Sequence, residues 1–266
     1  MPARTEPPAT GWDPAQYLRF ADARLRPALD LLAQVPLDAP SRVVDLGCGP
    51  GTVTRLLRAR FPATDLLGID ASEPMLAQAR AAVPGCRFVQ GDFASWTPAA
   101  PPDLIFSNAA LQWTGDHPTL LPRLLGLLAP GGVLAVQMPA MHDAPLRRLQ
   151  VQIAAEGPWA ARLAAVPGLA RDILDPGAYW ELLAPRTAAL DLWETSYLHV
   201  LAGPDPVVEW ASGSSLRPFL APLTEAERVA FRAAYAAALR PHYPPRADGT
   251  TLLAFRRLFL IARARG

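Results

Sequence analysis

Hydrophobic and polar residues follow a regular strand–helix rhythm between residues 42 and 137. Short apolar runs bounded by polar or glycine-rich segments predict five strands, at 42–46, 66–70, 87–89, 104–106 and 131–137. Apolar residues that recur every three or four positions predict helices between them, over 53–60, 72–83 and 119–128. Such an alternation is typical of a parallel sheet that helices cover on both faces.

The two ends of the chain show different patterns. Residues 13–32 have helical spacing, in which Pro27 predicts a break. Residues 143–185 and 205–240 predict helices interrupted by Pro and Gly, whereas 190–197 and 251–264 have the pattern of strands. We therefore expect an N-terminal arm with capping helices over 1–34, a sheet core over 35–140, and a helical lid with the last strands over 141–266.

Composition narrows the possible chemistry. All 25 basic residues are Arg, and the chain has no Lys and a single Asn, Asn108. A lysine Schiff base, a Walker A lysine and a Ser-Lys dyad are therefore excluded. Any bound anion must be held by Arg, His, hydroxyl groups or backbone N–H groups.

Charge and hydropathy exclude several protein classes. The net charge of +1 gives no basic excess, so we expect no nucleic-acid partner. The two cysteines do not form a disulfide framework. Because the N-terminus lacks an apolar signal sequence and no apolar stretch reaches about 20 residues, we expect a soluble cytoplasmic protein without a membrane span. We also expect no metal ion, and the oligomeric state stays open.

Three acidic residues end three predicted strands. Asp45 precedes the glycine turn 47–51, Asp70 closes the second strand, and Asp92 closes the third. In an open α/β sheet, ligands bind beyond the carboxyl ends of the strands. Carboxylates gathered there need a ligand that offers hydrogen-bond donors. The turn has the spacing G-x-G-x-G, with Thr52 where the dinucleotide-binding motif G-x-G-x-x-G has its third glycine.

The chemistry of these acids indicates one cofactor. Asp45 would repel a pyrophosphate and attract an α-amino group. Asp70 can accept from both hydroxyls of a ribose, and Asp92 can accept from an adenine amino group. These groups occur together in S-adenosyl-L-methionine (SAM), which has no phosphate, so we predict SAM as the cofactor. The alternative is an α/β domain whose loop acids are merely solvated.

Asn108 lies in the segment 107–113, directly after the fourth predicted strand. Its amide could offer both a donor and an acceptor near the sulfonium of SAM. The alternative is a helix N-cap, a common position for Asn. In a chain with one Asn, the place at this strand end favours the functional interpretation.

These motifs resemble those of a known family. The run 45–51, Asp70, Asp92 and the segment 130–132 are similar to the motif series of class I SAM-dependent methyltransferases. The resemblance implies a Rossmann-like α/β fold, with a mostly parallel seven-stranded sheet and helical lid insertions. Over nearly its full length the chain is most similar to the trans-aconitate 2-methyltransferase family, in the segments 12–26, 107–113, 136–139, 193–197, 216–218 and 255–259.

The resemblance also implies which residues surround the cofactor. The N-terminal helices would close over it, with Tyr17 and Arg24 at its methionyl carboxylate. For Tyr17, core packing at helical spacing is the alternative. The other positions expected to contact SAM are Asp45, Gly47, Gly49, Gly51, Asp70, Ala71, Met75, Asp92, Phe93, Asn108 and Trp113.

A carboxylate acceptor would need only positioning, because it is ionised at pH 7 and requires no general base. Asn108 and His199 are the only candidate catalytic groups. Arg suits such an acceptor because its guanidinium forms a bidentate fork. The residues expected to contact the acid are Tyr197, His199, Arg217, Arg256 and Arg257. Only one of the last two can face the pocket from an alternating strand, and solvation is the alternative for every Arg.

We therefore predict methyl transfer to a carboxylate oxygen of a small organic acid similar to trans-aconitate. The chain departs from the family's pattern at Met141, Arg147 and Leu198. With an altered pocket, the amino group of SAM could instead attack its own side chain and release methylthioadenosine, as in azetidine-2-carboxylate synthases of similar fold. A third interpretation is a non-catalytic SAM-binding subunit.

Overall fold

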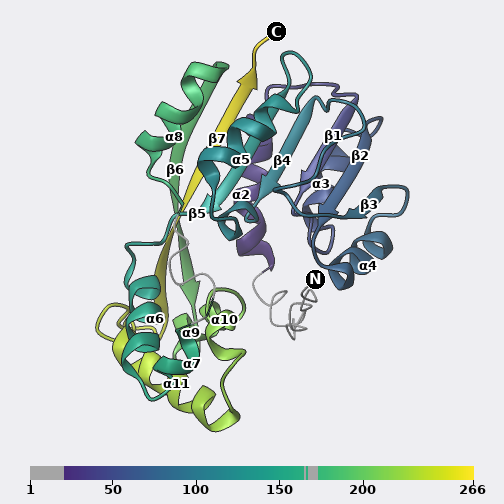
Figure 1. The fold of residues 1–266 in the computed structure, drawn as a ribbon. Coiled ribbons are helices and arrows are strands. Elements are labelled where there is room, and N and C mark those ends of the chain that lie inside the picture. Colours follow the sequence, from purple (N-terminus) through teal and green to yellow (C-terminus); the bar gives the residue numbers. More distant parts are fainter. Residues whose placement is uncertain (1–20, 165, 167–172) are drawn as a thin grey trace, which may run out of the picture. The chain divides into compact units, whose positions relative to one another are not determined.

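The computed structural model describes residues 21–164, 166 and 173–266 (Figure 1). The chain divides into two compact units. The sheet unit comprises, of the described residues, 24–142, 173–198 and 254–266. The helical unit comprises, of the described residues, 21–23, 143–164, 166 and 199–253.

A seven-stranded sheet has the strand order β3-β2-β1-β4-β5-β7-β6. The pairs β3–β2, β2–β1, β1–β4 and β4–β5 are parallel, whereas β7 is antiparallel to β5. This confirms the predicted α/β fold with a mostly parallel sheet. The strands are β1 (Arg42–Leu46), β2 (Asp65–Asp70), β3 (Arg87–Gln90), β4 (Leu104–Asn108), β5 (Val133–Pro139), β6 (Thr187–Leu201) and β7 (Thr251–Ala264).

The strand order reverses next to β1, because β2 and β4 pair on either side of it. At such a switch point a crevice opens at the carboxyl ends of the strands. The register aligns Asp45 with Phe106 of β4 and with Gly68 of β2, two residues before Asp70. The last residues of β1, β2 and β4 therefore lie along one edge of the sheet, which we call the carboxyl edge.

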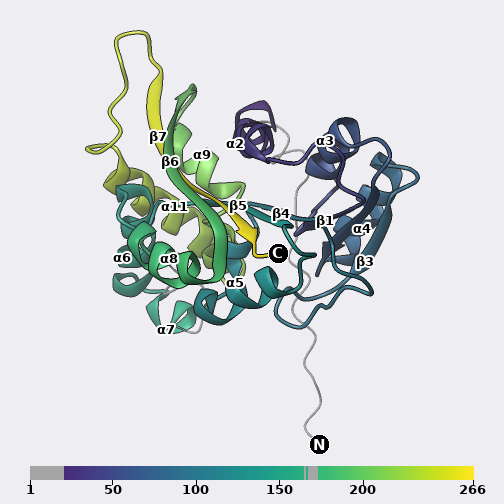
Figure 2. The same cartoon turned by 90° about the horizontal axis from the view of Figure 1, so that it is seen from above.

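Helices cover both faces of the sheet (Figure 2). On one face, the α2/α3 face, α2 (Ala21–Gln34) and α3 (Thr52–Arg60) pack on residues such as Phe106 and Ala135. On the other face, α5 (His117–Gly126) and α8 (Pro176–Leu183) pack on residues such as Ile105 and Val136. Because successive side chains alternate between faces, β4 and β5 are buried on both sides, which explains their nearly continuous apolar runs. The remaining elements of the sheet unit are α4 (Glu73–Ala82) and two short 3-10 helices, η1 (Leu111–Trp113) and η2 (Ala184–Arg186).

The helical unit has a core of its own. The ring centroids of Trp159 and Phe231 lie 5.0 Å apart, and the Tyr235 hydroxyl donates to the Leu146 carbonyl at 2.6 Å. Thr224 and Glu227 form a reciprocal capping box that starts the longest helix of this unit. The helices are α6 (Pro145–Glu156), α7 (Ala160–Leu163), α9 (Pro206–Ser212), α10 (Arg217–Leu220) and α11 (Glu225–Leu239).

The strands and helices predicted between residues 42 and 137 are all present, with ends shifted by no more than two residues. The predicted break at Pro27 is wrong, because α2 continues through it to Gln34. Ala28, Leu31 and Leu32 are buried against the α2/α3 face, and this burial outweighs the hydrogen bond that proline cannot form. In the described part of the chain, no helix is long and apolar enough to cross a membrane.

Candidate functional site

The glycine turn that follows β1 is fastened to the end of β2. The backbone N–H groups of Gly47 and Cys48 both donate to the Ile69 carbonyl, at 2.8 and 2.9 Å. The N–H of Gly49 donates to Oδ2 of Asp70 at 2.9 Å. These bonds hold the turn at the carboxyl edge, directly before α3.

Two positions of this turn require glycine. Gly47 has a φ of +83°, and a Cβ there would lie 2.2 Å from the Cβ of Ala110. Gly51 also has a φ of +83°, and a Cβ would lie 3.1 Å from Ala79 of α4. The turn therefore passes so close to the loop after β4 and to α4 that a side chain would push the backbone outward.

Asp45 is buried beneath the turn and is only 1 % exposed. The Thr54 hydroxyl donates to its Oδ2 at 2.6 Å. Burial raises the pKa of Asp45 from 3.8 to about 7; the charge of Asp70 adds to this rise, and the Thr54 bond opposes it. A cationic ligand group beside Asp45 would stabilise its carboxylate and lower this pKa.

Asp70 and Asp92 lie at the ends of β2 and β3. Oδ1 of Asp70 accepts from the N–H of Ser72 at 2.9 Å, in addition to the bond from the glycine turn. Asp92 is exposed, and its Oδ1 accepts from the N–H of Ala94 at 2.9 Å. Both carboxylates are oriented by backbone donors and retain lone pairs for ligand hydroxyl or amino groups.

Asn108 ends β4 and lies opposite Gln137 of β5. Its Oδ1 is buried and has no hydrogen-bond partner among the described residues. The next residue, Ala109, has a φ of 53°, a left-handed conformation that is uncommon for a residue with a Cβ. The alternative interpretation of Asn108 as a helix N-cap is wrong, because Ala110 occupies the cap position of η1.

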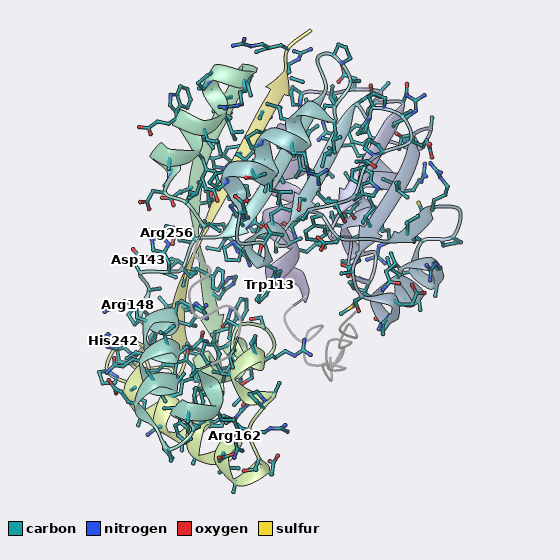
Figure 3. All side chains as sticks on the ribbon, in the orientation of Figure 1. Trp113, Asp143, Arg148, Arg162, His242 and Arg256 are labelled. Carbon is teal, nitrogen blue, oxygen red and sulfur yellow. The ribbon has the colours of Figure 1, made fainter. Side chains whose placement is uncertain are left out.

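Four further positions expected at the cofactor surround the same edge. Ala71 is exposed, and Met75 is half-buried in the first turn of α4. The ring of Phe93 would lie 3.1 Å from a Cβ at Gly47, so it contacts the glycine turn. Trp113 ends η1 and is 49 % exposed (Figure 3).

The N-terminal segment supplies two more predicted cofactor residues. Tyr17 lies outside the described residues. Arg24 belongs to α2, where the backbone alone is described at this position. The contacts of both residues with the cofactor stay predictions.

Arg256 and Arg257 lie on opposite faces of β7, as the alternation of a strand requires. The Nε of Arg256 donates to the Ala140 carbonyl at 3.0 Å and lies 3.6 Å from Oε1 of Glu194 (Figure 3). Arg256 therefore borders the face covered by α5 and α8, where its neighbour Leu258 is buried.

Arg257 lies on the α2/α3 face and is 5 % exposed. Its guanidinium carbon lies 4.6 Å from the centre of the Phe255 ring, and its Nη1 lies 3.5 Å from Oε1 of Gln137. The register places Arg257 opposite Pro139, the last residue of β5. Of the two arginines, Arg257 is therefore the one on the face that carries Asp45 and Asn108.

Tyr197 of β6 is 5 % exposed and connects β6 to α2. Its hydroxyl donates to Oδ2 of Asp30 at 2.7 Å, and its ring lies 5.5 Å from the guanidinium of Arg26. Burial raises the pKa of Tyr197, and the nearby charge of Arg257 lowers it. The hydroxyl therefore has a hydrogen-bond partner within the fold, and its contact with the acid substrate stays a prediction.

His199 and Arg217 belong to the helical unit. His199 is 8 % exposed, and its ring stacks on Trp210 with centroids 4.3 Å apart. Arg217 begins α10, and partial burial lowers its pKa. Their contacts with a substrate also stay predictions.

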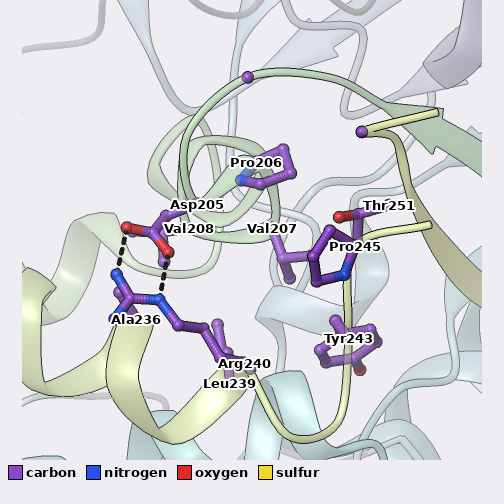
Figure 4. A pocket seen from close by; sticks show the side chains of 12 residues that line it. Asp205, Pro206, Val207, Val208, Ala236, Leu239, Arg240, Tyr243, Pro245 and Thr251 are labelled. Atoms are coloured by element: carbon purple, nitrogen blue, oxygen red, sulfur yellow. Dashed lines mark hydrogen bonds and ion pairs between the residues drawn. The ribbon is translucent and has the colours of Figure 1, made fainter. Parts of the chain in front are cut away.

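A pocket of about 220 Å³ lies in the helical unit, between α9, α11 and the start of β7 (Figure 4). The Arg240 guanidinium donates to both carboxylate oxygens of Asp205 at 3.0 Å, so the two charges compensate each other. Leu239, Val207 and Pro206 give the pocket an apolar lining. None of the predicted site residues lines it.

Gln137 is a buried polar residue outside the predicted set. It is 0 % exposed, and its Nε2 has no hydrogen-bond partner among the described residues. The signal in the sequence was an amide side chain inside the otherwise apolar run of β5.

The residues at the carboxyl edge fit SAM. The buried carboxylate of Asp45 and the buried Oδ1 of Asn108 can accept from an ammonium group, and Asp70 and Asp92 can accept from hydroxyl and amino groups. The reversed strand order, the glycine turn and these acids define a SAM-dependent methyltransferase of class I. A family model described as a methyltransferase domain matches residues 43–132.

Curated relatives identify one family within this class of methyltransferases. The chain is 53 % identical over 254 residues to a trans-aconitate 2-methyltransferase of Methylobacterium radiotolerans, covering 95 % of this chain and 98 % of the relative. It is 49 % identical to the enzyme of that name from Paracidovorax citrulli, with the same coverage. The chain belongs to the trans-aconitate 2-methyltransferase family. SAM is the methyl donor, and cyclisation of SAM and a non-catalytic role find no support.

Solved structures share the fold. The YcgJ protein of Bacillus subtilis has a TM-score of 0.61 at 16 % identity, covering 91 % of this chain and 99 % of that one. The phosphoethanolamine N-methyltransferase 2 of Haemonchus contortus, bound to S-adenosylhomocysteine, has a TM-score of 0.54 at 16 % identity, covering 90 % of this chain and 53 % of that one. These similarities concern the fold alone.

Gly47 and Gly49 of the turn allow a direct test of its close packing. We expect Gly47→Ala to lower the thermal midpoint of unfolding well below that of Gly49→Ala. Both positions have a positive φ, which costs about 1–2 kcal/mol for a residue with a Cβ, but only at Gly47 would the Cβ collide with another side chain. A Cβ at Gly49 meets nothing within 4 Å. Calorimetric unfolding of both variants makes the comparison, and equal midpoints would contradict the close packing.

The raised pKa of Asp45 predicts a pH-dependent stability of the ligand-free protein. Between about pH 4 and pH 7 the folded chain keeps a proton on Asp45 that the unfolded chain has released. The stabilisation from this proton is therefore complete below about pH 4 and lost as the pH rises through 7. We expect the free energy of unfolding of the wild type, relative to Asp45→Asn, to fall by up to about 1.4 kcal/mol per pH unit in this window.

Urea denaturation at pH 5, 6, 7 and 8 measures this difference. Asp65→Asn is the control, because Asp65 is exposed at the other end of β2. Parallel pH profiles for the wild type and Asp45→Asn would show that Asp45 titrates normally.

Proposed function

We propose that this methyltransferase transfers its methyl group to a carboxylate oxygen of a small organic acid, and that trans-aconitate is an acceptor. The observation that carries the proposal is the identity of 46–54 % to trans-aconitate 2-methyltransferases over about 95 % of the chain. The buried guanidinium of Arg257 supports it, because it offers a fork of donors on the face that carries Asn108.

The carboxyl edge would hold the cofactor through backbone and carboxylate groups. We assign the α-amino group to Asp45 and Asn108, the ribose hydroxyls to Asp70, and the adenine amino group to Asp92. The glycine turn lets the ligand approach the backbone, and Phe93, Met75, Ala71 and Trp113 would border it. When bound, SAM supplies an electrophilic methyl group.

The acceptor would need to be held rather than activated. A carboxylic acid with a pKa near 4 is already ionised at pH 7, so no side chain has to remove a proton. Arg257 would orient the carboxylate by two parallel N–H bonds. Tyr197, His199, Arg217 and Arg256 stay candidates for the other carboxylates of a polyacid.

Product analysis tests the reaction. We expect S-adenosylhomocysteine and a methyl ester to form only when the protein is incubated with SAM and trans-aconitate together. The trimethyl ester of the same acid, which has no free carboxylate, is the matched control and should give neither product. Mass spectrometry of both mixtures measures whether S-adenosylhomocysteine and the methyl ester have formed. Release of methylthioadenosine from SAM alone, or no turnover with any di- or tricarboxylate, would overturn the proposal.

Substitution of Asp70 tests the assignment of the ribose. We expect Asp70→Ala to weaken S-adenosylhomocysteine binding by about 1–3 kcal/mol, because hydroxyl donors lose a charged acceptor and the Gly49 N–H loses its partner. Asp65→Ala, at the opposite end of the same strand, should leave the affinity unchanged. Titration calorimetry measures both, and an unchanged affinity of the Asp70 variant would exclude its role.

A further inference from the structure

A row of polar side chains crosses three strands on the α2/α3 face at the carboxyl edge. Asn108 on β4 lies opposite Gln137 on β5. Arg257 on β7 lies opposite Pro139, two residues after Gln137. The strand neighbours Ala135 and Phe259 are buried on the same face, so the row interrupts an otherwise apolar surface.

Two side chains of this row carry buried polar atoms without partners among the described residues. Gln137 is fully buried, and its Nε2, a donor, has none. The Oδ1 of Asn108, an acceptor, has none either. An unsatisfied buried polar group costs free energy, whereas an apolar side chain of the same shape would not. In native proteins such groups are few, and each one requires an explanation.

The contact with Arg257 fixes which end of the Gln137 amide is unsatisfied. A guanidinium can only donate hydrogen bonds, so the amide oxygen must face it. The structure has this arrangement, with Oε1 3.5 Å from Nη1 of Arg257. The amide nitrogen, which can only donate, is therefore the end of Gln137 without a partner, and it belongs to a side chain that contacts a buried cation.

We propose that Gln137 and Arg257 together bind a carboxylate group, with the Nε2 of Gln137 donating to one of its oxygens. A carboxylate has a charge opposite to that of Arg257, and its lone pairs can accept from the unpartnered Nε2 of Gln137. This proposal rests on the proposed function, which supplies two ligands with a carboxylate, the acceptor acid and the methionyl part of SAM. The chemistry is the same for both, and the experiment separates them.

Gln137→Met is the central variant, because methionine has a similar length and no donor. Titration calorimetry would measure three affinities in the wild type and the variant: trans-aconitate with the S-adenosylhomocysteine complex, S-adenosylhomocysteine alone, and 5′-methylthioadenosine, which lacks the carboxylate. We expect at least a tenfold loss for one carboxylate ligand and none for methylthioadenosine. We also expect the thermal midpoint to fall by less than it would for a glutamine whose amide is bonded at both ends, because the variant removes an unsatisfied donor and only one long bond, from Arg257 to Oε1 at 3.5 Å.

The affinities that the variant loses show whether the bound carboxylate belongs to the acceptor acid or to the cofactor. Loss of trans-aconitate affinity at unchanged S-adenosylhomocysteine affinity supports the acceptor. Loss of S-adenosylhomocysteine affinity at unchanged methylthioadenosine affinity supports the cofactor. Unchanged affinity for both carboxylate ligands overturns the proposal, and so does a lowered thermal midpoint with unchanged affinities, which would make Gln137 structural.

Gln150→Met provides a matched structural control. Gln150 is also 0 % exposed, but its amide donates to Ser215 at 2.8 Å and accepts from Arg147 at 3.2 Å. Because both ends of this amide are bonded, the same substitution should lower the thermal midpoint. A smaller fall in the thermal midpoint for Gln137→Met than for Gln150→Met, together with the loss of carboxylate affinity, would mark Gln137 as a binding residue.

Gln137→Glu keeps the size of the side chain and is a second, independent variant. It replaces the donor by an oxygen, so a ligand carboxylate would meet a like charge, and the loss of affinity should exceed that of Gln137→Met. An affinity equal to that of the wild type would overturn the proposal. A wild-type protein that binds acids without methylating them would refute the proposed function alone, whereas unaltered binding by an active variant would refute the Gln137 site alone.

Discussion

Three backbone N–H groups fasten the glycine turn to the end of β2, and the site depends on them. Those of Gly47 and Cys48 share the Ile69 carbonyl, and that of Gly49 reaches the Asp70 carboxylate. Because these acceptors end a parallel strand, the register of β1 against β2 decides where the turn lies. A slip by one residue would move Asp45 to the opposite face and leave the turn without its acceptors.

Several groups at the carboxyl edge are held in states that cost folding free energy. Asp45 is buried and accepts a hydrogen bond from Thr54, and the Nε2 of Gln137 in β5 has no partner among the described residues. A sheet buried on both faces supplies enough apolar contact to tolerate these costs. Sites that must recognise a charged ligand often retain such destabilising groups, since the ligand satisfies them.

The sheet and its acidic edge could be predicted because they depend on local patterns, namely apolar runs, helical spacing and acids at strand ends. The choice between Arg256 and Arg257 could not, because the pairing of β5 with β7 joins segments 120 residues apart. Gln137 was missed for a similar reason: a sequence shows an amide in an apolar run but not which of its atoms lacks a partner. The break predicted at Pro27 was wrong because the burial of apolar side chains of α2 outweighs the local effect of proline on a helix.

The left-handed conformation of Ala109 has a consequence for how Asn108 meets its ligand. Glycine would adopt this conformation without strain, but it would also allow the loop after β4 many others. Alanine restricts the unfolded chain but is strained in this conformation, and the bond from its N–H to the Gln137 carbonyl at 2.9 Å helps to hold it there. The backbone that carries Asn108 is thus positioned before any ligand arrives, and binding need not lose entropy in ordering this strand end.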